Sequence, residues 1–348
     1  EFVLRALKNG KDVVTANKAL LACHGEEILE LAARNGCFVG CEGAVAGGIP
    51  IIKVIREGLV ANRISRLEGI INGTCNYILT GMERRQIPFD KILKEAQEKG
   101  FAEEDPSFDI EGTDAAHKLT ILASLLFGVP LAFNEVTVEG ISEVELDDIN
   151  YAAKLGYRVK HLAMAVQSPS GIELRVHPTL VSKNHMLATV DLEMNAIVLD
   201  GDMLGRLLIS GAGAGAGPTA SSVLADVVDS IRDSDKKLTL LPARLDDGLT
   251  EKNSITKTRK IRSAFYFRLI AINEPGMLAA ITKVLAARKI SIEVFIQDEE
   301  RGSGDRVPII IITEKIEEHQ AILASKAISE MSGIFGAVKR FRVDKSDK

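Results

Sequence analysis

The sequence predicts a mixed α/β and α+β protein built from three successive units. Over the first 41 residues, helix and strand patterns alternate as αβαβ, which is typical of a doubly wound parallel sheet with crossover helices. Between residues 157 and 209, two pairs of alternating strands flank short turns, which favours an antiparallel sheet. Residues 262–348 follow the order βαββαβ of a ferredoxin-like unit. A length of 348 residues fits two or three domains of roughly 100–200 residues each.

The N-terminal unit begins in the middle of its own pattern. The expected elements are a helix at Phe2–Leu7, a strand at Val13–Thr15, an amphipathic helix at Glu26–Ala33 and a strand at Phe38–Cys41. Gly10 follows the first helix, where glycine commonly ends helices. Because the chain opens with Glu1 rather than Met and partway through the alternation, we expect it to be part of a larger polypeptide with further βα units upstream.

The middle region combines helices with paired strands. The expected helices are Ile51–Gly58, a short one after Gly73 and Thr74, Asp90–Lys99 with Asp90 as N-cap, Asp114–Phe127 and Ala220–Ile231. The expected strands are Ile64–Ile71, Tyr157–Val166, Ile172–Val176, Ala196–Leu199 and Met203–Ile209. The helix at Ala220–Ile231 is expected to close this region.

The C-terminal region is separated by a polar stretch. Residues 246–260 have mixed charge and no apolar period, which predicts a linker. The elements that follow are expected at Phe265–Ile272 (strand), Gly276–Ala287 (helix), Ser291–Ile296 (strand), Val307–Ile312 (strand), Glu318–Met331 (helix) and Ala337–Val343 (strand).

Composition excludes several classes of protein. With 43 basic and 48 acidic residues the net charge is −5, which argues against non-specific binding to nucleic acid or anionic membranes. No apolar run approaches the roughly 20 residues of a membrane span, and no secretory signal is visible. The four cysteines crowd into the first quarter of the chain, unlike a disulfide framework, and Cys37 and Cys41 lack a second ligand pair at zinc spacing. We therefore expect a cytoplasmic protein.

One acidic stretch carries candidate chemistry. Residues 100–118 place six carboxylates between two helices, and Lys118 lies four residues after Asp114 on an otherwise apolar helix. A solvated acidic loop and a simple i,i+4 ion pair of roughly 0.3–0.5 kcal/mol are the structural alternatives. The functional interpretation is that burial of the ammonium group favours proton transfer, while the surrounding carboxylates bind a substrate ammonium group.

A glycine-rich segment imitates a dinucleotide fingerprint. Gly211–Ala216 matches G-x-G-x-x-[GA] after an apolar strand and before a helix. The preceding strand belongs to a predicted hairpin, however, and no clear parallel βα unit follows. We expect this segment to let backbone approach a ligand that another domain holds, rather than to begin a dinucleotide-binding fold.

The stretch Ala96–Lys118, with Gly100, Asp105-Pro106, Asp109, Gly112, Asp114 and Lys118 at these spacings, resembles the signature of homoserine dehydrogenases. The resemblance spans nearly the whole chain; further matching segments are Gly10–Lys18, Glu42–Pro50, Gly69–Leu79 and Gly211–Ser221. The C-terminal unit, with Asn273–Leu278, resembles an ACT domain. The family implies reversible hydride transfer between NAD(P)H and L-aspartate 4-semialdehyde, giving L-homoserine on the route to threonine, methionine and isoleucine.

The resemblance also implies domain boundaries. Residues 1–49 correspond to the C-terminal remnant of a Rossmann-type NAD(P)-binding domain, and 50–245 to the α+β catalytic, substrate-binding and dimerisation domain. A linker at 246–261 and an ACT regulatory domain at 262–348 follow. The family's N-terminal glycine fingerprint is absent from this stretch, so we expect the stretch alone to bind no dinucleotide and to be inactive.

Catalytic and substrate roles follow from the family by position. Lys118 matches the lysine that donates a proton to the forming alkoxide, and Asp114 matches the acid that orients it. Glu103 and Asp109 match carboxylates near the substrate amino group, with Glu104 adjacent. Gly73 and Thr74 fall in the loop near the substrate.

Cofactor, cation and effector roles follow in the same way. Lys18, Gly215 and Thr219 match residues that line the cofactor site, although the choice between NAD and NADP is not readable. Glu42, Val45, Gly47 and Ile49 match a monovalent-cation site, Na+ being the expected ion; a plain glycine-rich turn is the alternative.

Asn273 and Gly276 form the expected effector turn of the ACT domain, with L-threonine as expected ligand. We also expect a homodimer or homotetramer. The competing hypothesis is a catalytically silent amino-acid sensor of the ACT type, which would have no reason to keep Lys118, Asp114 and Glu103 at dehydrogenase spacing.

Overall fold

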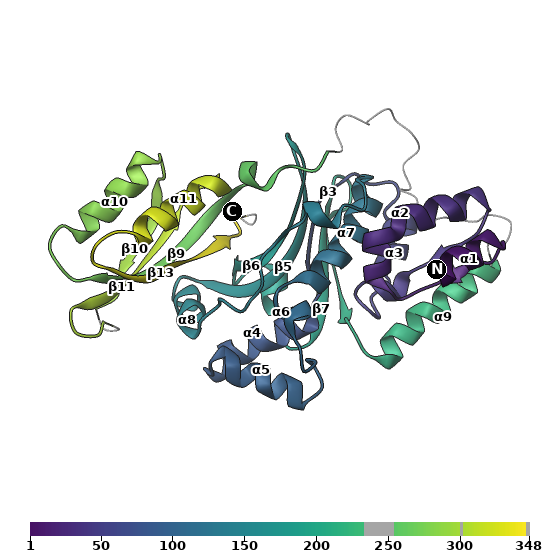
Figure 1. The fold of residues 1–348 in the computed structure, drawn as a ribbon, viewed down its shortest axis with the longest axis horizontal. Helices are drawn as coiled ribbons and strands as arrows, with labels where there is room; N and C mark the ends of the chain where they lie inside the picture. The colour runs from purple at the N-terminus through teal and green to yellow at the C-terminus, as the bar shows by residue number, and fades with distance from the viewer. Residues whose placement is uncertain (233–253, 300–301, 346–348) are drawn as a thin grey trace.

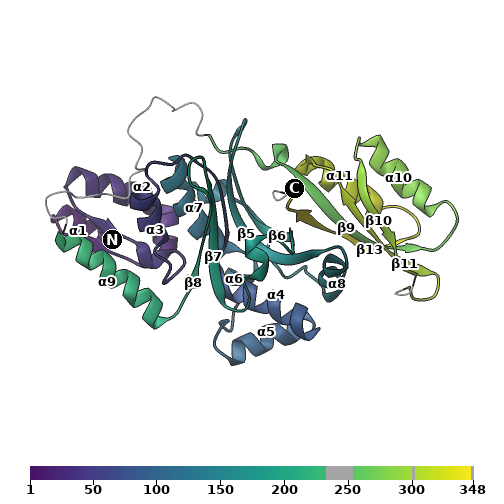
Figure 2. The same ribbon diagram turned by 180° about the vertical axis from the view of Figure 1, so that it is seen from behind.

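The computed structural model describes residues 1–232, 254–299 and 302–345. Three parts lie side by side along the long axis (Figure 1): an N-terminal α/β unit, a central sheet with its helices, and a C-terminal unit. The view from behind shows the same order (Figure 2), with the central strands between the two outer parts. Among the described residues, no helix is both long and apolar enough to cross a bilayer.

The N-terminal unit has the predicted αβαβ order. Its elements are α1 (Phe2–Lys8), β1 (Val13–Val14), α2 (Lys18–Arg34) and β2 (Val39–Gly40), followed by the 3-10 turn η1 (Glu42–Ala44). Strands β1 and β2 pair in parallel, with Val13 opposite Val39. Helix α2 starts earlier than expected because the side chain of Asn17 accepts from Leu20 N at 3.0 Å and caps its first turn.

Helix α9 (Ala216–Arg232) was expected to close the middle region, and this prediction is wrong. The helix instead returns to the N-terminal unit and packs on η1, β1 and β2 (Figure 1). The approach is close at Gly40, where an added Cβ would lie 2.7 Å from Cβ of Asp226. Asp226 Oδ2 in turn accepts the backbone N–H of Glu42 at 2.8 Å.

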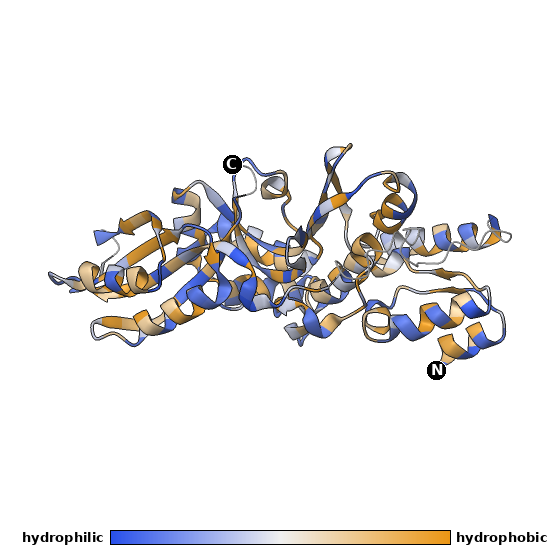
Figure 3. Cartoon of the chain, turned by 90° about the horizontal axis from the view of Figure 1, so that it is seen from above, coloured by the Kyte–Doolittle hydropathy of each residue, from blue (hydrophilic) through white to orange (hydrophobic). Residues whose placement is uncertain are grey.

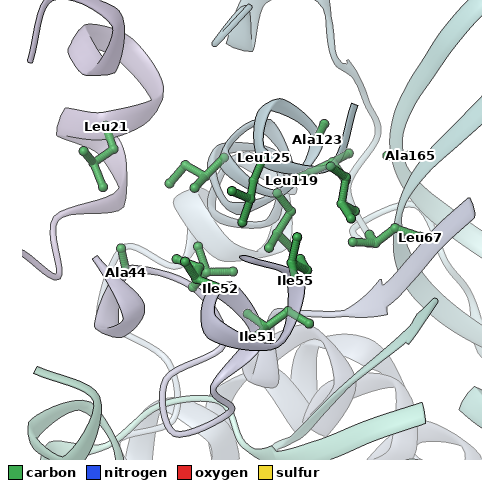
Figure 4. Packing of buried hydrophobic residues seen from close by; sticks show 14 of the residues in the cluster. Leu21, Ala44, Ile51, Ile52, Ile55, Leu67, Leu119, Ala123, Leu125 and Ala165 are labelled. Atoms are coloured by element: carbon green, nitrogen blue, oxygen red, sulfur yellow. The ribbon is translucent and has the colours of Figure 1, made fainter. Parts of the chain in front are cut away.

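One hydrophobic core joins the N-terminal unit to the middle region. After η1 the chain forms α3 (Ile51–Lys53), continues as the π-helical turn η2 (Val54–Gly58) and enters β3 (Ile64–Ile70). Figure 4 shows Ile52 and Ile55 facing Leu119 and its neighbours on α7 (Thr113–Phe127), with Ala44 beside Ile52. This apolar contact fixes the N-terminal unit against the helix that carries Lys118.

The middle sheet is antiparallel, as the paired strands predicted. Its elements are the hairpin β5 (Tyr157–Ser168) and β6 (Gly171–Ser182) and the hairpin β7 (Met194–Gly201) and β8 (Gly205–Ala212). Strand β3 lies between β5 and β7, which gives the order β6-β5-β3-β7-β8. The short β4 (Thr137–Val138) pairs in parallel with β6.

The helices of the middle region lie around this sheet. They are α4 (Gly73–Arg85), α5 (Phe89–Glu98), α6 (Ser107–Ile110), α7 and α8 (Leu146–Lys154), with 3-10 turns η3 (Phe133–Glu135) and η4 (Met186–Thr189). Asp90 was expected to cap α5, but Pro88 occupies the N-cap and Asp90 lies in the first turn. A proline fixes the entry to the helix there, and an acidic residue in the first turn still suits the helix dipole.

The C-terminal unit has the predicted βαββαβ order, with one short extra strand. Its elements are β9 (Arg262–Ile272), α10 (Met277–Ala287), β10 (Ile292–Gln297), β11 (Arg306–Thr313), β12 (Ile316–Glu317), α11 (Glu318–Ser329) and β13 (Ile334–Val343). The order β10-β11-β9-β13 places the first and third strands at the centre. Figure 3 shows mostly hydrophobic residues along these strands, while the helices carry both kinds. Apolar side chains of α10 and α11 pack on Phe265 and Phe267.

The C-terminal unit is joined to the middle sheet by strand pairing. Strand β13 pairs in parallel with β6, with Arg342 opposite Thr179, so one 11-stranded sheet runs through both parts. A second contact comes from the face of β9 opposite Phe265 and Phe267. There Arg268 Nη2 lies 2.7 Å from Oε2 of Glu145, on the loop before α8. Of the predicted linker, residues 246–253 lie outside the described residues, and Thr258–Lys260 form the 3-10 turn η5.

Candidate active site

Lys118 is held at the N-terminal half of α7, where the end of β3 reaches it. Its Nζ donates to Asp114 Oδ2 at 2.6 Å and to the backbone carbonyl of Ile71 at 2.8 Å. The lysine is 8% exposed and the aspartate 2%, because both lie on the apolar helix that the sheet and the N-terminal unit cover. The i,i+4 ion pair is therefore present, but it belongs to a buried cluster rather than standing alone.

Asp114 receives three donors from three parts of the chain. Lys118 and Asn72 reach Oδ2 at 2.6 and 2.9 Å, while Lys18 Nζ lies 2.9 Å from Oδ1. Burial favours the neutral acid, but the two ammonium groups outweigh it, and the net effect lowers the pKa of Asp114. The carboxylate is therefore ionised and sits between two cations.

Asp109 lies on α6 and accepts hydrogen bonds from the turn between β3 and α4. Its Oδ1 accepts from Asn72 Nδ2 at 2.7 Å and its Oδ2 from the Thr74 hydroxyl at 3.2 Å. Burial is the largest cause that raises the pKa of Asp109, and nearby Asp114 adds to it. Thr74 is also 2.7 Å from the carbonyl oxygen of Phe101, so this hydroxyl connects α4 to the acidic loop.

The acidic loop leaves Glu103 and Glu104 exposed after α5. Gln97 Nε2 donates to both of their backbone carbonyls at 3.1 Å, which fixes the loop. Their carboxylates have no hydrogen bond or ion pair with the part of the chain that the structure describes. The structure thus groups Asp109, Asp114 and Lys118. Glu103 lies apart from them, and its carboxylate has no partner among the described residues.

Lys18 connects the N-terminal unit to this cluster. It is the first residue of α2, immediately after the cap residue Asn17 and close to the carboxyl end of β1. Its side chain is 35% exposed and its Nζ lies 5.7 Å from the centre of the Phe108 ring. One ammonium group therefore faces both the interior cluster and solvent.

Gly73, Gly215 and Thr219 lie on two segments that meet the site from outside the acidic stretch. Gly73 begins α4, and a Cβ there would lie 2.7 Å from the carbonyl oxygen of Glu193, so only glycine fits. Gly215 has φ +115° and directly precedes α9, whose first turn holds Thr219 beside Gly43. Strand β8 before this turn is antiparallel to β7, so the Gly211–Ala216 segment is not the start of a parallel dinucleotide fold, as expected.

The Glu42–Ile49 loop combines a buried carboxylate with backbone carbonyls. Both Glu42 oxygens accept backbone N–H groups at the start of α3, from Ile52 at 2.8 Å and Lys53 at 2.9 Å. Burial raises the pKa of Glu42 to about 7. Gly47 has φ +53° and lies against the Gly213 backbone, and its carbonyl accepts the Ser222 hydroxyl at 2.7 Å.

Sequence reasoning missed Asn72, which the structure places at the centre of the site. Its amide nitrogen donates to Asp109 and Asp114, and its Oδ1 accepts from Cys75 N at 2.8 Å as the N-cap of α4. A polar residue between a buried strand and the start of a helix was the available signal. Asn72 lies within the matching segment Gly69–Leu79, which by itself gives it no role.

A second cluster of possible metal ligands is an ion-pair network instead. Among the described residues, Glu68, His185 and Asp344 bring ligand atoms within 4.8 Å of one another. His185 Nδ1 accepts from Leu187 N at 3.1 Å, so Nε2 carries the proton and faces Glu68 Oε2 at 3.1 Å. Arg66 contacts both carboxylates, which supplies the countercharge.

The Asn273–Leu278 segment connects β9 to α10. Asn273 Oδ1 accepts from Gln297 Nε2 at 3.1 Å, and Gly276 has φ +93° as the N-cap of α10. The end of β10 therefore lies beside this turn within the same C-terminal unit.

Comparisons with known proteins give one family throughout. Residues 50–228 match the homoserine dehydrogenase family, and residues 1–42 match the homoserine dehydrogenase NAD binding domain. Homoserine dehydrogenase of Pseudomonas aeruginosa is 49% identical over 348 residues, which covers 99% of this chain and 80% of that protein. The Neisseria gonorrhoeae enzyme is 47% identical, covering 94% and 76%.

Solved structures agree. The crystal structure of a homoserine dehydrogenase from Thiobacillus denitrificans matches with a TM-score of 0.92 and 46% identity, over 98% of this chain and 78% of that one. A hyperthermophilic archaeal homoserine dehydrogenase in complex with NADPH matches with a TM-score of 0.58 and 32% identity, over 66% and 67%. The chain therefore belongs to the homoserine dehydrogenase family of NAD(P)-dependent oxidoreductases.

Proposed function

We propose that Lys118 carries the proton in the interconversion of L-homoserine and L-aspartate 4-semialdehyde. An ammonium group has three N–H donors, and here Asp114 and the Ile71 carbonyl accept from it. The third is free to reach the substrate oxygen. This free third N–H is the observation that supports the role of Lys118. In aldehyde reduction Lys118 gives a proton to that oxygen, and in homoserine oxidation it takes the proton back. When bound, NAD(P) supplies the hydride acceptor or donor.

Asp114 holds Lys118 in position and balances its charge. Because Asp114 stays ionised between Lys118 and Lys18, it stabilises the ammonium form that exists before proton donation. Asn72 donates to Oδ2, the oxygen that also accepts from Lys118, so rotation of Asp114 would break both hydrogen bonds. We assign orientation, rather than proton transfer, to Asp114.

The substrate ammonium group is assigned to Asp109 and Glu103. Glu103 offers an uncommitted exposed carboxylate, and Asp109 is partly buried beside Thr74. Carboxylates at such a position form charge-assisted hydrogen bonds with an ammonium ion. The close packing at Gly73 keeps the backbone of the β3–α4 turn near this space.

NAD(P) binding is assigned to Lys18, Gly215 and Thr219. Gly215 is exposed, and the start of the 17-residue helix α9 presents backbone N–H groups and a positive helix end. These features fit an anionic dinucleotide, and Lys18 would lie between it and Asp114. The backbone N–H groups at the start of α9 and the Lys18 ammonium group are thus compatible with binding of NAD(P).

A monovalent cation, Na+ being the first candidate, is assigned to the loop of Glu42, Val45, Gly47 and Ile49. Backbone carbonyl oxygens suit a hard ion of low charge. The Glu42 carboxylate already caps α3, so the carbonyl oxygens of the loop would supply most of the ligands. Binding there would fix η1 against α9, beside the Gly213–Gly215 segment.

We assign regulation to an ACT domain at residues 262–348, after an NAD(P)-binding unit at 1–49, a catalytic domain at 50–245 and a linker at 246–261. Helix α9 falls in the range 50–245 but packs on β1 and β2, so we assign it to the NAD(P)-binding unit instead. The order β10-β11-β9-β13 with both helices on one face supports the ACT assignment. L-Threonine is the proposed effector at Asn273 and Gly276.

A homodimer is the proposed assembly, with a homotetramer as the larger alternative. The edge strand β8 and its turn expose Met203 at 72%, Leu204 at 42% and Leu208 at 36%, which a second copy could cover.

The four cysteines are free thiols, which suits the reducing cytoplasm as the proposed location.

The test is homoserine oxidation by the full-length protein, compared between wild type, Lys118→Ala and Lys99→Ala. Lys99 makes the same i,i+4 contact with Glu95, at 2.6 Å, but its side chain is exposed at the C-cap of α5. Lys118→Ala should lower kcat by roughly 10²–10⁴, with a smaller change in cofactor affinity, while Lys99→Ala should match wild type. A Lys118→Ala enzyme with wild-type kcat contradicts the assigned role. Lack of homoserine oxidation in the wild-type enzyme would favour the silent sensor.

A further inference from the structure

A small cavity lies where the middle sheet meets the C-terminal unit, away from Lys118. Its volume is about 70 Å³, and strands β6, β9 and β13 form its walls. The lining residues that matter here are Arg175, Thr179, Arg262, Ser263, Lys315 and Arg342. A site of this size holds several waters or one ion as large as phosphate, since one water needs roughly 10–15 Å³ of such volume.

Some of the cavity's cations are already neutralised by carboxylates. Arg342 Nη2 contacts Glu318 Oε1 at 2.6 Å, and Arg66 Nη2 contacts Asp344 Oδ1 at 3.0 Å. Lys345 pairs with Glu293. Asp344 is the carboxylate in the cavity wall, and it shares the charge of Arg66 with Glu68. These pairs add no net positive charge to the cavity.

Two cations on the open side have no such partner. Arg262 Nη2 donates to the backbone carbonyl of Lys315 at 3.0 Å, and the Arg262 side chain has no carboxylate within the described part of the chain. The Lys315 ammonium has no hydrogen bond or ion pair with any described residue. Both residues are exposed, so they add positive charge at the mouth of the cavity without having lost their hydration.

Arg175 and Ser263 line the cavity and keep donors that no described residue uses. Arg175 is 6% exposed; its Nη1 donates to Ser263 Oγ at 2.8 Å and its Nη2 contacts Glu173 at 3.2 Å, but its buried Nε has no partner. A buried donor without an acceptor is costly, so an acceptor is expected there. Because Ser263 Oγ accepts from Arg175, its own hydroxyl hydrogen is available to a ligand.

We propose that this cavity binds a small tetrahedral oxyanion of the size and charge of phosphate. Arg175 and Ser263 would bind it from the sheet side, and Arg262 and Lys315 from the open side. Guanidinium groups bind such oxygens through paired N–H donors. Since these residues come from β6 and from the C-terminal unit, the bound anion would strengthen the contact between the two parts.

The test is phosphate binding to the whole chain at constant ionic strength, with chloride as the reference anion. Thermal unfolding and titration calorimetry are measured on wild type, on Arg262→Gln/Lys315→Gln, and on Arg259→Gln/Lys260→Gln. The last pair removes one arginine and one lysine charge from the exposed turn η5, just outside the cavity. All four side chains are exposed, so neither double variant should impair folding.

We expect a saturable rise in the unfolding temperature with phosphate but not with chloride. Arg262→Gln/Lys315→Gln should weaken phosphate binding by about tenfold or more, because charge-assisted hydrogen bonds are lost. Arg259→Gln/Lys260→Gln should bind like wild type. Equal effects of phosphate and chloride, or equal weakening in both double variants, would overturn the proposal and leave a cavity filled by water.

Discussion

The side-chain nitrogen of Asn72 lies 2.9 Å from Asp114 Oδ2, although 42 residues separate them. The contact forms because the end of β3 leads Asn72 to the first turn of α7, which carries Asp114, and the same nitrogen also reaches Asp109 at 2.7 Å. A single amide thus holds two carboxylates of the site in place. Its oxygen is used elsewhere, as the cap of α4.

Asn72→Asp should lower kcat/KM for homoserine by about tenfold or more at neutral pH. The variant keeps the cap oxygen and the shape of the side chain, but a third carboxylate then faces Asp109 and Asp114. Because protonation restores a donor, the loss should shrink as the pH falls. The measurement is a pH profile of kcat/KM. A loss that is the same at every pH would point to a folding defect instead.

Asp109→Asn and Glu103→Gln should each raise the KM for homoserine more than they lower kcat. Both carboxylates are proposed to bind the substrate ammonium in the ground and transition states alike, and such uniform binding appears in KM. Glu104→Gln is the matched control, since it is an exposed neighbour on the same loop. A defect in kcat alone would move Asp109 or Glu103 into proton transfer.

Glu42→Gln should make stability less dependent on pH. Burial, with Asp226 adding to it, raises the pKa of Glu42 to about 7, against about 4.3 in an unfolded chain. The folded state therefore binds more protons between these values. The contribution to the free energy of unfolding, on the order of 3 kcal/mol, is fully present below about pH 4.3 and is lost as the pH rises through about 7.

The measurement is urea unfolding of wild type, Glu42→Gln and Glu27→Gln between about pH 4.5 and 8. Glu27 is an exposed glutamate on α2 and should behave like wild type. Glu42→Gln disturbs one of two backbone contacts and lowers stability at low pH, so the slope with pH is the readout. A variant with the wild-type slope would show that Glu42 is ionised in the folded protein.

L-Threonine should inhibit the enzyme through the Asn273 turn, with a coupling of roughly 5–150-fold in affinity. Asn273→Ala removes the contact with Gln297 and should reduce threonine sensitivity without changing kcat in its absence. A point variant is the better test because β13 pairs with β6, so deleting the C-terminal unit would expose the middle sheet. Unchanged inhibition in Asn273→Ala would place the effector elsewhere, and no inhibition of wild type would leave this unit structural.

Local pattern was enough to predict most elements and one pair of the site. The alternation of apolar residues identified α1, β1, the two hairpins and the βαββαβ order, because helix and strand periods are properties of neighbouring residues. The pairing of Asp114 with Lys118 was predictable for the same reason, since residues four apart lie on one helix face.

Tertiary structure decided the rest of the site. Lys18, Asn72 and Asp114 come together only because one apolar core fixes α2 and β3 against α7, and a spacing in sequence contains no such distance. The return of α9 to β1 and β2, and the use of Glu42 to cap α3, depend on the same packing. What the sequence by itself determined was therefore the elements and the residues with chemistry, while long-range packing decided which of those residues meet.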